Sequence, residues 1–233
     1  SDPPLAQVVA KSYEVGVRGA HQGWNWTLGL FHTVNHNDIL FINGGNLTSE
    51  GYFDNVGRTR RQGLEAAFAK QVGDWAFSGS YTLLDATFQT GFIANSPNNP
   101  AANADSQITV EKGDRIPSLP RHNLKLATRW QATNALQVGA DVQYNSSQYF
   151  RGDEANLNDQ LAGYTVANVH ATYAVAPSVE LFARVENLFD RDYETFALFG
   201  ESDEVLEDLG IDDANFVGPG KPRTATIGIR AKF

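Results

Sequence analysis

The feature that most constrains the fold is a two-residue alternation of apolar and polar side chains through long segments. Between residues 24 and 28, for example, Trp24, Trp26 and Leu28 alternate with Asn25 and Thr27. Successive side chains of a β-strand point to opposite faces, so the pattern predicts strands with one apolar and one polar face. The pattern predicts strands at about 11–20, 23–42, 51–71, 74–89, 121–132, 135–150, 163–175, 178–194 and 223–233.

These segments are long for the strands of a soluble protein, which average about 5–6 residues. A tilted strand needs about 9–11 residues to cross a bilayer, and the predicted strands meet that length. The sequence has no apolar run of about 18 residues, so it predicts neither a transmembrane helix nor a signal-peptide core. That criterion does not apply to membrane β-barrels, whose lipid-facing residues occupy every second position.

The connections between the predicted strands alternate between short turns and long loops. The short turns are His21-Gln22-Gly23, Val72-Gly73-Asp74, Thr133-Asn134 and Ala176-Pro177-Ser178. The long loops cover about 43–50, 90–120, 151–162 and 195–222, and they are rich in Asn, Asp, Gly and Pro. Short turns at one end and long loops at the other are typical of outer-membrane barrels.

The polar faces carry charged residues in one strand after another, which suits a water-filled or plugged bore but also a soluble sheet with one solvated face. The charged positions are Glu14, Arg18, Glu65, Lys125, Arg129, Asp141, Arg184, Glu186 and Arg230. Aromatic placement favours the barrel, because Trp24, Trp75, Trp130 and Tyr173 each lie beside a short turn and would form an interfacial girdle. We therefore predict an all-β fold, a transmembrane antiparallel up-and-down β-barrel.

The amino-acid composition argues against several classes of function. The formal net charge of −9, without a basic stripe, argues against a nucleic-acid partner. Cysteine is absent, which excludes thiolate metal sites and disulfides, and methionine is absent even at position 1, which indicates a processed chain or a fragment. The sequence contains no nucleophile elbow, phosphate-binding glycine loop or H-E-x-x-H zinc motif, and we expect neither an enzyme nor a bound cofactor.

Four segments resemble the TonB-dependent outer-membrane receptors, and together the resemblance covers essentially the whole chain. They are SYEVGVRG at 12–19, NVGRTRRQGLEAAFA at 55–69, the pair IPSLPRHNLKLATRW at 116–130 and VENLFDRDYE at 185–194, and PGKPRTATIGIRAKF at 219–233. In the last of these, Phe233 resembles the C-terminal signal read by the barrel assembly machinery. Asn187 and Asp190 lie where a strand passes into a loop, where polar side chains satisfy backbone groups.

The resemblance implies a roughly 22-stranded barrel around a plug that is pulled by TonB. Residues 1–233 would be the C-terminal portion of that barrel, without the plug, the TonB box or the N-terminal strands, because about nine antiparallel strands cannot close in lipid. The resemblance also implies a cell outer membrane location in a Gram-negative bacterium, with outer-membrane lipid and lipopolysaccharide around the wall. The expected function is import of a ferric siderophore, with cobalamin, haem or saccharide as alternatives.

Two alternative interpretations assign the chain to other classes of protein. A soluble β-sandwich binding module or adhesin would bury the apolar faces against a second sheet and stay monodisperse without detergent. A barrel phospholipase would need a Ser–His pair on the lipid-facing surface, and the outward faces read here have none.

Aromatic residues and an arginine near the long loops are the substrate-binding candidates, because a siderophore complex is often anionic and partly aromatic. Hydrophobic packing among the loops is the alternative role. The candidates are Phe92, Tyr149, Phe150, Arg151, Phe196 and Phe199.

Two groups are candidates for metal binding. His32, His36 and Asp38 would share one strand face toward the bore, where a plain polar lining is the alternative. The loop 201–213 is rich in carboxylates, whose oxygens suit Ca²⁺, although their spacing matches no EF-hand and a solvated loop is the alternative.

Overall fold

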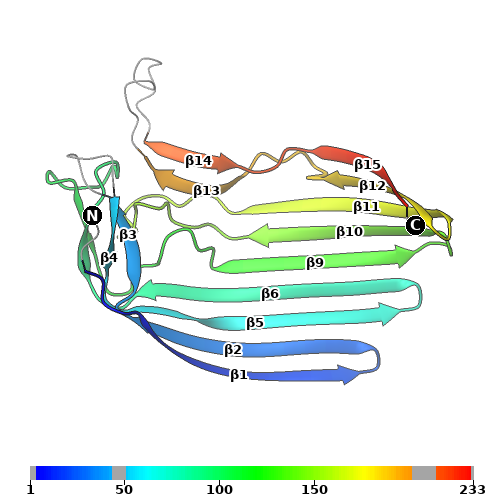
Figure 1. Ribbon diagram of the computed structural model, residues 1–233, viewed down its shortest axis with the longest axis horizontal. Helices are drawn as coiled ribbons and strands as arrows, with labels where there is room; N and C mark the ends of the chain where they lie inside the picture. The colour runs from blue at the N-terminus through cyan, green and yellow to red at the C-terminus, as the bar shows by residue number, and fades with distance from the viewer. Residues whose placement is uncertain (1–3, 44–50, 201–213, 232–233) are drawn as a thin grey trace, which may run out of the picture.

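The computed structural model describes residues 4–43, 51–200 and 214–231, and its long strands form one antiparallel sheet (Figure 1). The nine strands lie in the order β1-β2-β5-β6-β9-β10-β11-β12-β15, so β1 and β15 form the two edges. Their bounds are Val9–His21, Trp24–His36, Thr59–Val72, Trp75–Phe88, His122–Gln131, Leu136–Asn145, Tyr164–Ala176, Val179–Glu186 and Thr224–Ala231. In the described ranges no helix is long and apolar enough to cross a membrane.

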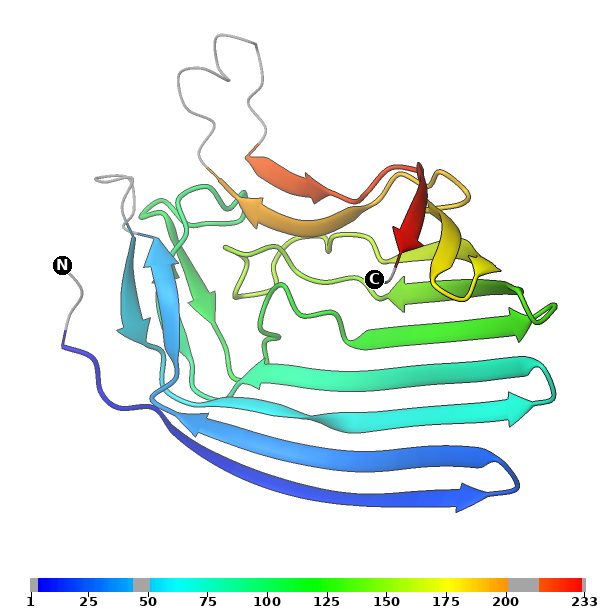
Figure 2. The same cartoon turned by 45° about the vertical axis from the view of Figure 1, so that its right-hand side comes forward.

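Three small hairpins stand on the ends of these strands, at the end opposite the short turns (Figures 1 and 2). Two of them lie almost entirely within the predicted loops 90–120 and 195–222, where residues such as Asn, Gly and Pro conceal short β pairs. They are β3–β4 (Ile39–Asn43 with Gly51–Asn55), β7–β8 (Phe92–Asn95 with Gln107–Val110) and β13–β14 (Glu194–Phe199 with Asn215–Pro219).

The nine predicted strands match the nine strands of the large sheet, but four of them extend well beyond the observed strand; the segment 135–150, for example, ends as β10 at Asn145. The segment 23–42 breaks after β2 because Asn37 takes the left-handed conformation (φ 54°), and β3 then pairs in a separate sheet. Gly57 (φ 81°) breaks 51–71 in the same way. The segment 178–194 ends at Glu186 and resumes as β13.

Asn187 and Asp190 satisfy backbone groups after β12, as predicted. Asn187 is buried and left-handed, and its side-chain amide donates to the carbonyl oxygens of Arg191 (2.8 Å) and Lys221 (3.1 Å). Asp190 accepts from the backbone N–H of Arg223 at 3.2 Å and from its guanidinium at 3.1 Å. These contacts hold the segment before β15 against the end of β12.

The sheet has one apolar face, and the strand register makes it continuous. Antiparallel partners share a face, so one row runs from Trp26 through Phe68, Gly79 and Leu126 to Val142. Large apolar side chains on this face are exposed rather than packed on a second sheet, with Ile227 at 83%. A sheet that leaves such a face open in the described residues fits lipid contact and not a β-sandwich.

The predicted aromatic girdle lies on this apolar face beside the short turns. Trp75 and Trp130 are direct partners, and their rings stack 5.4 Å apart at 8°. On β2 the apolar run from Trp24 reaches the polar His32 after eight residue steps, a height of about 20 Å for a strand tilted by about 40°. That height is close to the apolar band of about 25 Å in outer-membrane barrels.

Candidate functional site

The long loops and the three hairpins pack together into a body that we call the loop platform (Figure 2). It comprises β3–β4, β7–β8, β13–β14 and the segments 96–106, 111–121 and 146–163. Its apolar core draws on strand ends and loops alike, and it is the main buried apolar cluster of the described residues. The core residues are Ile42, Val56, Ala86, Phe88, Ala94, Ile108, Val110, Ile116 and Ala155.

A buried carboxylate organises the segment 146–163. Asp153 is 0% exposed, and its carboxylate accepts hydrogen bonds from the backbone N–H groups of Leu157 and Asn158, each at 3.0 Å. The side-chain amides of Asn99 and Asn158 also donate to it, each at 3.1 Å. Because Asn99 belongs to a different loop, this carboxylate ties two loops of the platform together.

Two further contacts fix the segment 146–163 to its neighbours. The Asn156 side chain accepts from the backbone N–H of Arg115 at 2.6 Å and donates to its carbonyl oxygen at 2.9 Å. On the other side, the Arg151 backbone N–H donates to the Ala197 carbonyl at 3.0 Å, and the Phe199 N–H donates to the Arg151 carbonyl at 2.9 Å. The segment is therefore held to β13 by strand-like bonds.

The platform presents a cation beside two exposed aromatic rings. The Arg151 guanidinium lies 5.4 Å from the centre of the Phe41 ring, and Phe41 meets Phe53 edge-on at 5.5 Å. All three side chains are exposed. A guanidinium beside aromatic faces is suited to an anionic ligand with aromatic groups. We call Arg151, Phe41 and Phe53 the platform cluster.

The six predicted substrate-binding residues do not form one site. Phe150 stacks on Phe199 with ring centres 5.0 Å apart, next to Arg151 in sequence. Phe196 is 38% exposed on β13. Tyr149 instead lies under the Arg115 guanidinium at 5.8 Å, and Phe92 packs edge-on against the buried Phe88 at 5.2 Å.

The metal-binding candidates are not brought together. Asp38 accepts from the Thr59 hydroxyl and from the Arg61 guanidinium, whose nitrogen lies 3.1 Å away. Among the described residues no three His, Asp or Glu side chains form a group able to hold a metal ion. The acidic loop 201–213 and Phe233 lie outside the described residues.

The expected orientation of His32 toward the bore is wrong. His32 is a direct partner of Tyr13 and follows Leu28 and Leu30 on the same face of β2, the apolar outward face. Its Nδ1 lies 3.1 Å from Gln62 Oε1, so it joins a polar group at the upper edge of the apolar band. The even-numbered alternation that fixes Leu28 outward also fixes His32 outward.

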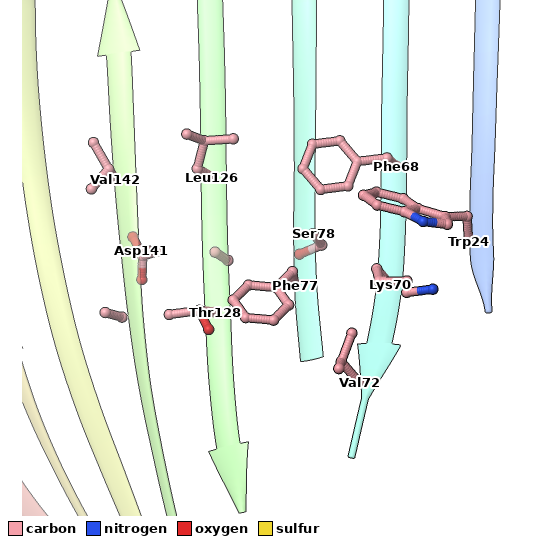
Figure 3. Close-up of a pocket in the computed structure, with 12 residues that line it drawn as sticks. Trp24, Phe68, Lys70, Val72, Phe77, Ser78, Leu126, Thr128, Asp141 and Val142 are labelled. Atoms are coloured by element: carbon pink, nitrogen blue, oxygen red, sulfur yellow. The ribbon is translucent and has the colours of Figure 1, made fainter. Parts of the chain in front are cut away.

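A groove on the apolar face lies away from the platform. Figure 3 shows it between Trp24, Phe68, Phe77 and Leu126, with space of about 540 Å³. It lies at the level of the girdle, and Lys70 sits over the Trp24 ring at 5.3 Å at one margin. Its apolar lining on the outward face fits lipid chains and not a polar nutrient.

Sequence reasoning missed Phe41, Phe53 and Asp153 as site residues. Phe41 and Phe53 fall within segments predicted to be long membrane strands, and the breaks at Asn37 and Gly57 transfer them to the platform. Asp153 follows a glycine in a polar loop, where an aspartate is usually solvated. The paired Asn and Asp residues at 99, 153, 156 and 158 were the available signal of a loop network.

The pKa of Glu154 gives the platform a pH dependence. Burial raises the pKa of its carboxyl, and the neighbouring Asp153 adds to this, while the Gly152 backbone N–H and Arg151 oppose it. The folded platform thus binds this proton more tightly than the unfolded chain does. Its stability therefore falls as pH rises from the usual Glu value of 4.5 toward the raised folded value.

We expect the variant Glu154→Gln to remove this loss of platform stability with rising pH. The protection of backbone amides in residues 146–163, that is, the slowing of exchange relative to the intrinsic rate at the same pH, should be higher at neutral pH than in the parent protein and should no longer depend on pH in the acid range. Glu111→Gln, which changes an exposed carboxylate on the same platform, is the control and should leave the dependence in place. Equal pH dependence in the parent and in Glu154→Gln would contradict the assignment.

This chain is similar to known proteins in sequence and in fold. A family model described as TonB dependent receptor-like, beta-barrel, matches residues 1–188. The catecholate siderophore receptor Fiu of Escherichia coli is 27% identical over 169 residues, which cover 72% of this chain and 20% of that protein. The ferric enterobactin receptor of Pseudomonas aeruginosa is 33% identical over 132 residues, covering 53% of this chain and 17% of the receptor.

Solved structures show the same arrangement of strands. The siderophore receptor PiuA of Acinetobacter baumannii superposes with a TM-score of 0.71 at 21% identity, over 96% of this chain and 28% of that one. The copper transporter OprC gives a TM-score of 0.72 at 20% identity, over 97% of this chain and 32% of that one. The chain thus spans less than a third of the length of the proteins it resembles.

Proposed function

We propose, from the premise that this chain belongs to the TonB-dependent receptor family of outer-membrane β-barrels, that it forms part of a receptor importing a ferric siderophore. Members of this family are receptors and transporters rather than enzymes, and the chain supplies wall strands and ligand-facing loops. TonB would drive import through a plug in the bore. The observation that carries the substrate class is the platform cluster, a guanidinium beside two exposed aromatic rings.

The chemistry of a ferric catecholate fits this cluster. Such a complex is anionic, and its ligand groups are aromatic rings, so it offers charge to Arg151 and ring faces or edges to Phe41 and Phe53. The hydrogen bonds that join Arg151 to β13 fix its backbone before the ligand arrives, which lowers the entropy cost of binding. The relatives whose names mention catecholate siderophores and enterobactin support this substrate class.

The test uses the whole receptor of which this chain is part, in a strain without other catecholate receptors. Growth under iron limitation should be restored by ferric enterobactin and not by ferric citrate. If no ferric siderophore supports growth or binds the purified receptor, the proposed substrate class is wrong. Binding of ferric citrate alone would keep iron import and exclude the catecholate.

Removing the cluster should weaken binding without unfolding the wall. We expect the double variant Arg151→Gln, Phe41→Ala to bind ferric enterobactin about tenfold or more weakly, since a cation and an aromatic contact are each worth about 0.5–2 kcal/mol. Titration of intrinsic fluorescence in detergent measures the Kd. Arg18→Gln removes one charge near the short turns, at the far end of β1, and should leave the Kd unchanged.

A further inference from the structure

The last two strands of the large sheet stop together, and a separate hairpin continues beyond them (Figure 1). β12 pairs with β15 as far as Glu186, and β13 pairs with β14 from Glu194 onward. Between these two ladders the segment 187–193 lies opposite the shorter segment 220–223, and no β-ladder joins these two described segments. The hairpin β13–β14 therefore needs other contacts to fix its direction relative to the sheet.

The side chain of Asn187 connects the two interrupted segments. Its amide nitrogen donates to one carbonyl oxygen in each of them, that of Arg191 at 2.8 Å and that of Lys221 at 3.1 Å. Its Oδ1 accepts from the backbone N–H of Arg191 at 3.0 Å. Because Asn187 is buried, these three hydrogen bonds replace the contacts with water that the amide has lost. We call this arrangement the Asn187 clasp.

The clasp is anchored to the neighbouring strand β11. The backbone N–H of Asn187 donates to Asn168 Oδ1 at 2.9 Å, and the N–H of Leu188 donates to the Ala167 carbonyl at 2.8 Å. Asn168 is held in turn by Asp141 on β10, whose carboxylate accepts from the Asn168 amide at 2.6 Å. Two strands of the wall thus set the position from which the Asn187 side chain reaches the hairpin.

The position of Asn187 places two demands on its residue type. Its backbone is left-handed (φ 50°), a conformation that glycine, asparagine and aspartate adopt most readily. The clasp also uses two amide donors and one acceptor, which asparagine supplies. Glycine would fit the backbone without any side-chain hydrogen bond, and an ionised aspartate would offer acceptors only. The amide is therefore the part of this residue that joins the hairpin to the wall.

The hairpin in turn holds the backbone of Arg151. The Arg151 N–H donates to the Ala197 carbonyl at 3.0 Å, and the Phe199 N–H donates to the Arg151 carbonyl at 2.9 Å. Phe41, over whose ring the Arg151 guanidinium lies, belongs to the hairpin β3–β4, which stands on other strands of the sheet. A change in the direction of β13–β14 would therefore move Arg151 relative to Phe41.

We propose that Asn187 is a positioning residue for the ligand site: the clasp fixes the hairpin β13–β14 on the wall and so holds Arg151 beside Phe41. The inference rests on the proposed function, because its consequence is an effect on ligand affinity. Asn187 acts through Arg151 and not by touching the ligand. Without the clasp, Arg151 is present but no longer held in place, and the ligand must order it on binding, which lowers the affinity.

The first measurement needs no ligand. Residues 1–233 contain no cysteine, so Val217→Cys on β14 and Val175→Cys on β11 each take one spin label, in a whole receptor whose other cysteines are replaced. Both positions are exposed. Double electron–electron resonance in detergent then measures the distance between hairpin and wall. We expect one narrow distribution in the parent and a broadened or shifted one in Asn187→Asp, which keeps the side-chain size but replaces the amide donors with an acceptor.

The second measurement is the Kd for ferric enterobactin. Asn187→Asp should bind it about three- to tenfold more weakly than the parent, the cost of ordering one long side chain on binding. In an Arg151→Gln background the same substitution should change the Kd by less than about twofold, because the clasp acts through Arg151. Asn187→Gly should repeat both results. It keeps the left-handed backbone and introduces no buried carboxylate, so it serves if Asn187→Asp does not fold.

The matched control is Phe189→Ala, which removes a large side chain from the same segment. This side chain is 76% exposed and forms none of the hydrogen bonds of the clasp. The control should keep the distance distribution and the Kd of the parent.

An unchanged distance distribution in Asn187→Asp and Asn187→Gly overturns the proposal. So does an equal loss of affinity with and without the Arg151 side chain, because Asn187 would then not act through Arg151. If the parent receptor binds no ferric siderophore, the proposed function fails and the effect on affinity fails with it. An altered distance would still show in that case that Asn187 places the hairpin.

Discussion

Replacing Asp153 with Ala should unfold the segment 146–163 while the wall of strands stays intact. The carboxylate is fully buried and receives four hydrogen bonds from three residues, and its removal leaves buried N–H donors without an acceptor. Hydrogen bonds to a charged acceptor are worth about 1.5–3 kcal/mol each, and loss of such a network costs about 3–5 kcal/mol in total. Hydrogen exchange in the segment should then approach the rate of an unfolded chain.

The Asp153→Asn variant separates the network from the side-chain volume. Its amide keeps one acceptor oxygen but turns the other into a donor facing the Asn158 N–H, so the loss should be intermediate. Affinity for the proposed siderophore ligand should follow the same order, because Arg151 loses its support when the segment unfolds. The heat-modifiable migration of the barrel on gels should stay normal in both variants. If Asp153→Ala disrupts the barrel itself, the platform is not a separate unit.

Replacing Leu28 with Arg should destabilise the wall far more than the same change one residue earlier. Leu28 lies between Trp24 and His32 on the outward face of β2, near the middle of the apolar band. An arginine on the lipid face near the bilayer midplane costs about 2–4 kcal/mol. Thr27, on the opposite face, looks toward the polar side with Arg18 as its strand partner.

The measurement is reversible unfolding of the whole receptor in lipid vesicles by urea. We expect Leu28→Arg to shift the folding free energy by about 2–4 kcal/mol and Thr27→Arg by less than about 1 kcal/mol. The pair is matched in strand, in depth and in the residue introduced, so the difference reports the solvent of each face. Equal costs would mean that the two faces are not lipid and bore, and the wall assignment would fail.

The large sheet was predictable because the alternation that gives each strand its two faces is contained in the local sequence of that strand. Once the segment is extended, one face carries Trp24, Trp26 and Leu28. These apolar side chains are stable on an open face only when lipid contacts it. The short turns then fix which strands are neighbours, so the pairs β1–β2, β5–β6, β9–β10 and β11–β12 follow from the sequence. The register of these strand pairs and the positions of the girdle residues follow from the same short turns.

The ends of the strands were not predictable in the same way. Four consecutive polar residues, 35–38, and four apolar ones, 39–42, interrupt the alternation, but they do not show by themselves whether the strand continues. The left-handed backbone of Asn37 ends β2, and β3 pairs in a separate sheet. Asparagine tolerates that conformation but does not require it. The orientation of His32 was a different error, because the alternation already fixed it on the side of Leu28.

The sequence predicted one member of the platform cluster, Arg151, and not the other two. Arg151 and the stacked pair Phe150 and Phe199 lie on the platform, as a reading of the loops for aromatic and cationic residues indicated. Tyr149 and Phe92 also belong to the platform, but their rings contact Arg115 and Phe88 rather than the platform cluster, because contacts between distant loops decide which side of the chain each ring takes. Such contacts join residues about 40–60 positions apart, as between Asn99 and Asp153, and no local pattern encodes them.

The buried apolar core lies in the loops and not between the strands. The parts of the sequence that can change during evolution are therefore the reverse of the usual ones. In most proteins the connecting loops drift while the strands are constrained by packing. Here an outward leucine can become isoleucine, valine or phenylalanine at little cost, because fluid lipid adapts to any of these shapes. Ile108, Phe88 and Asp153 have rigid neighbours on every side. New specificity would therefore arise by exchanging exposed residues around the platform, with its interior retained as a frame.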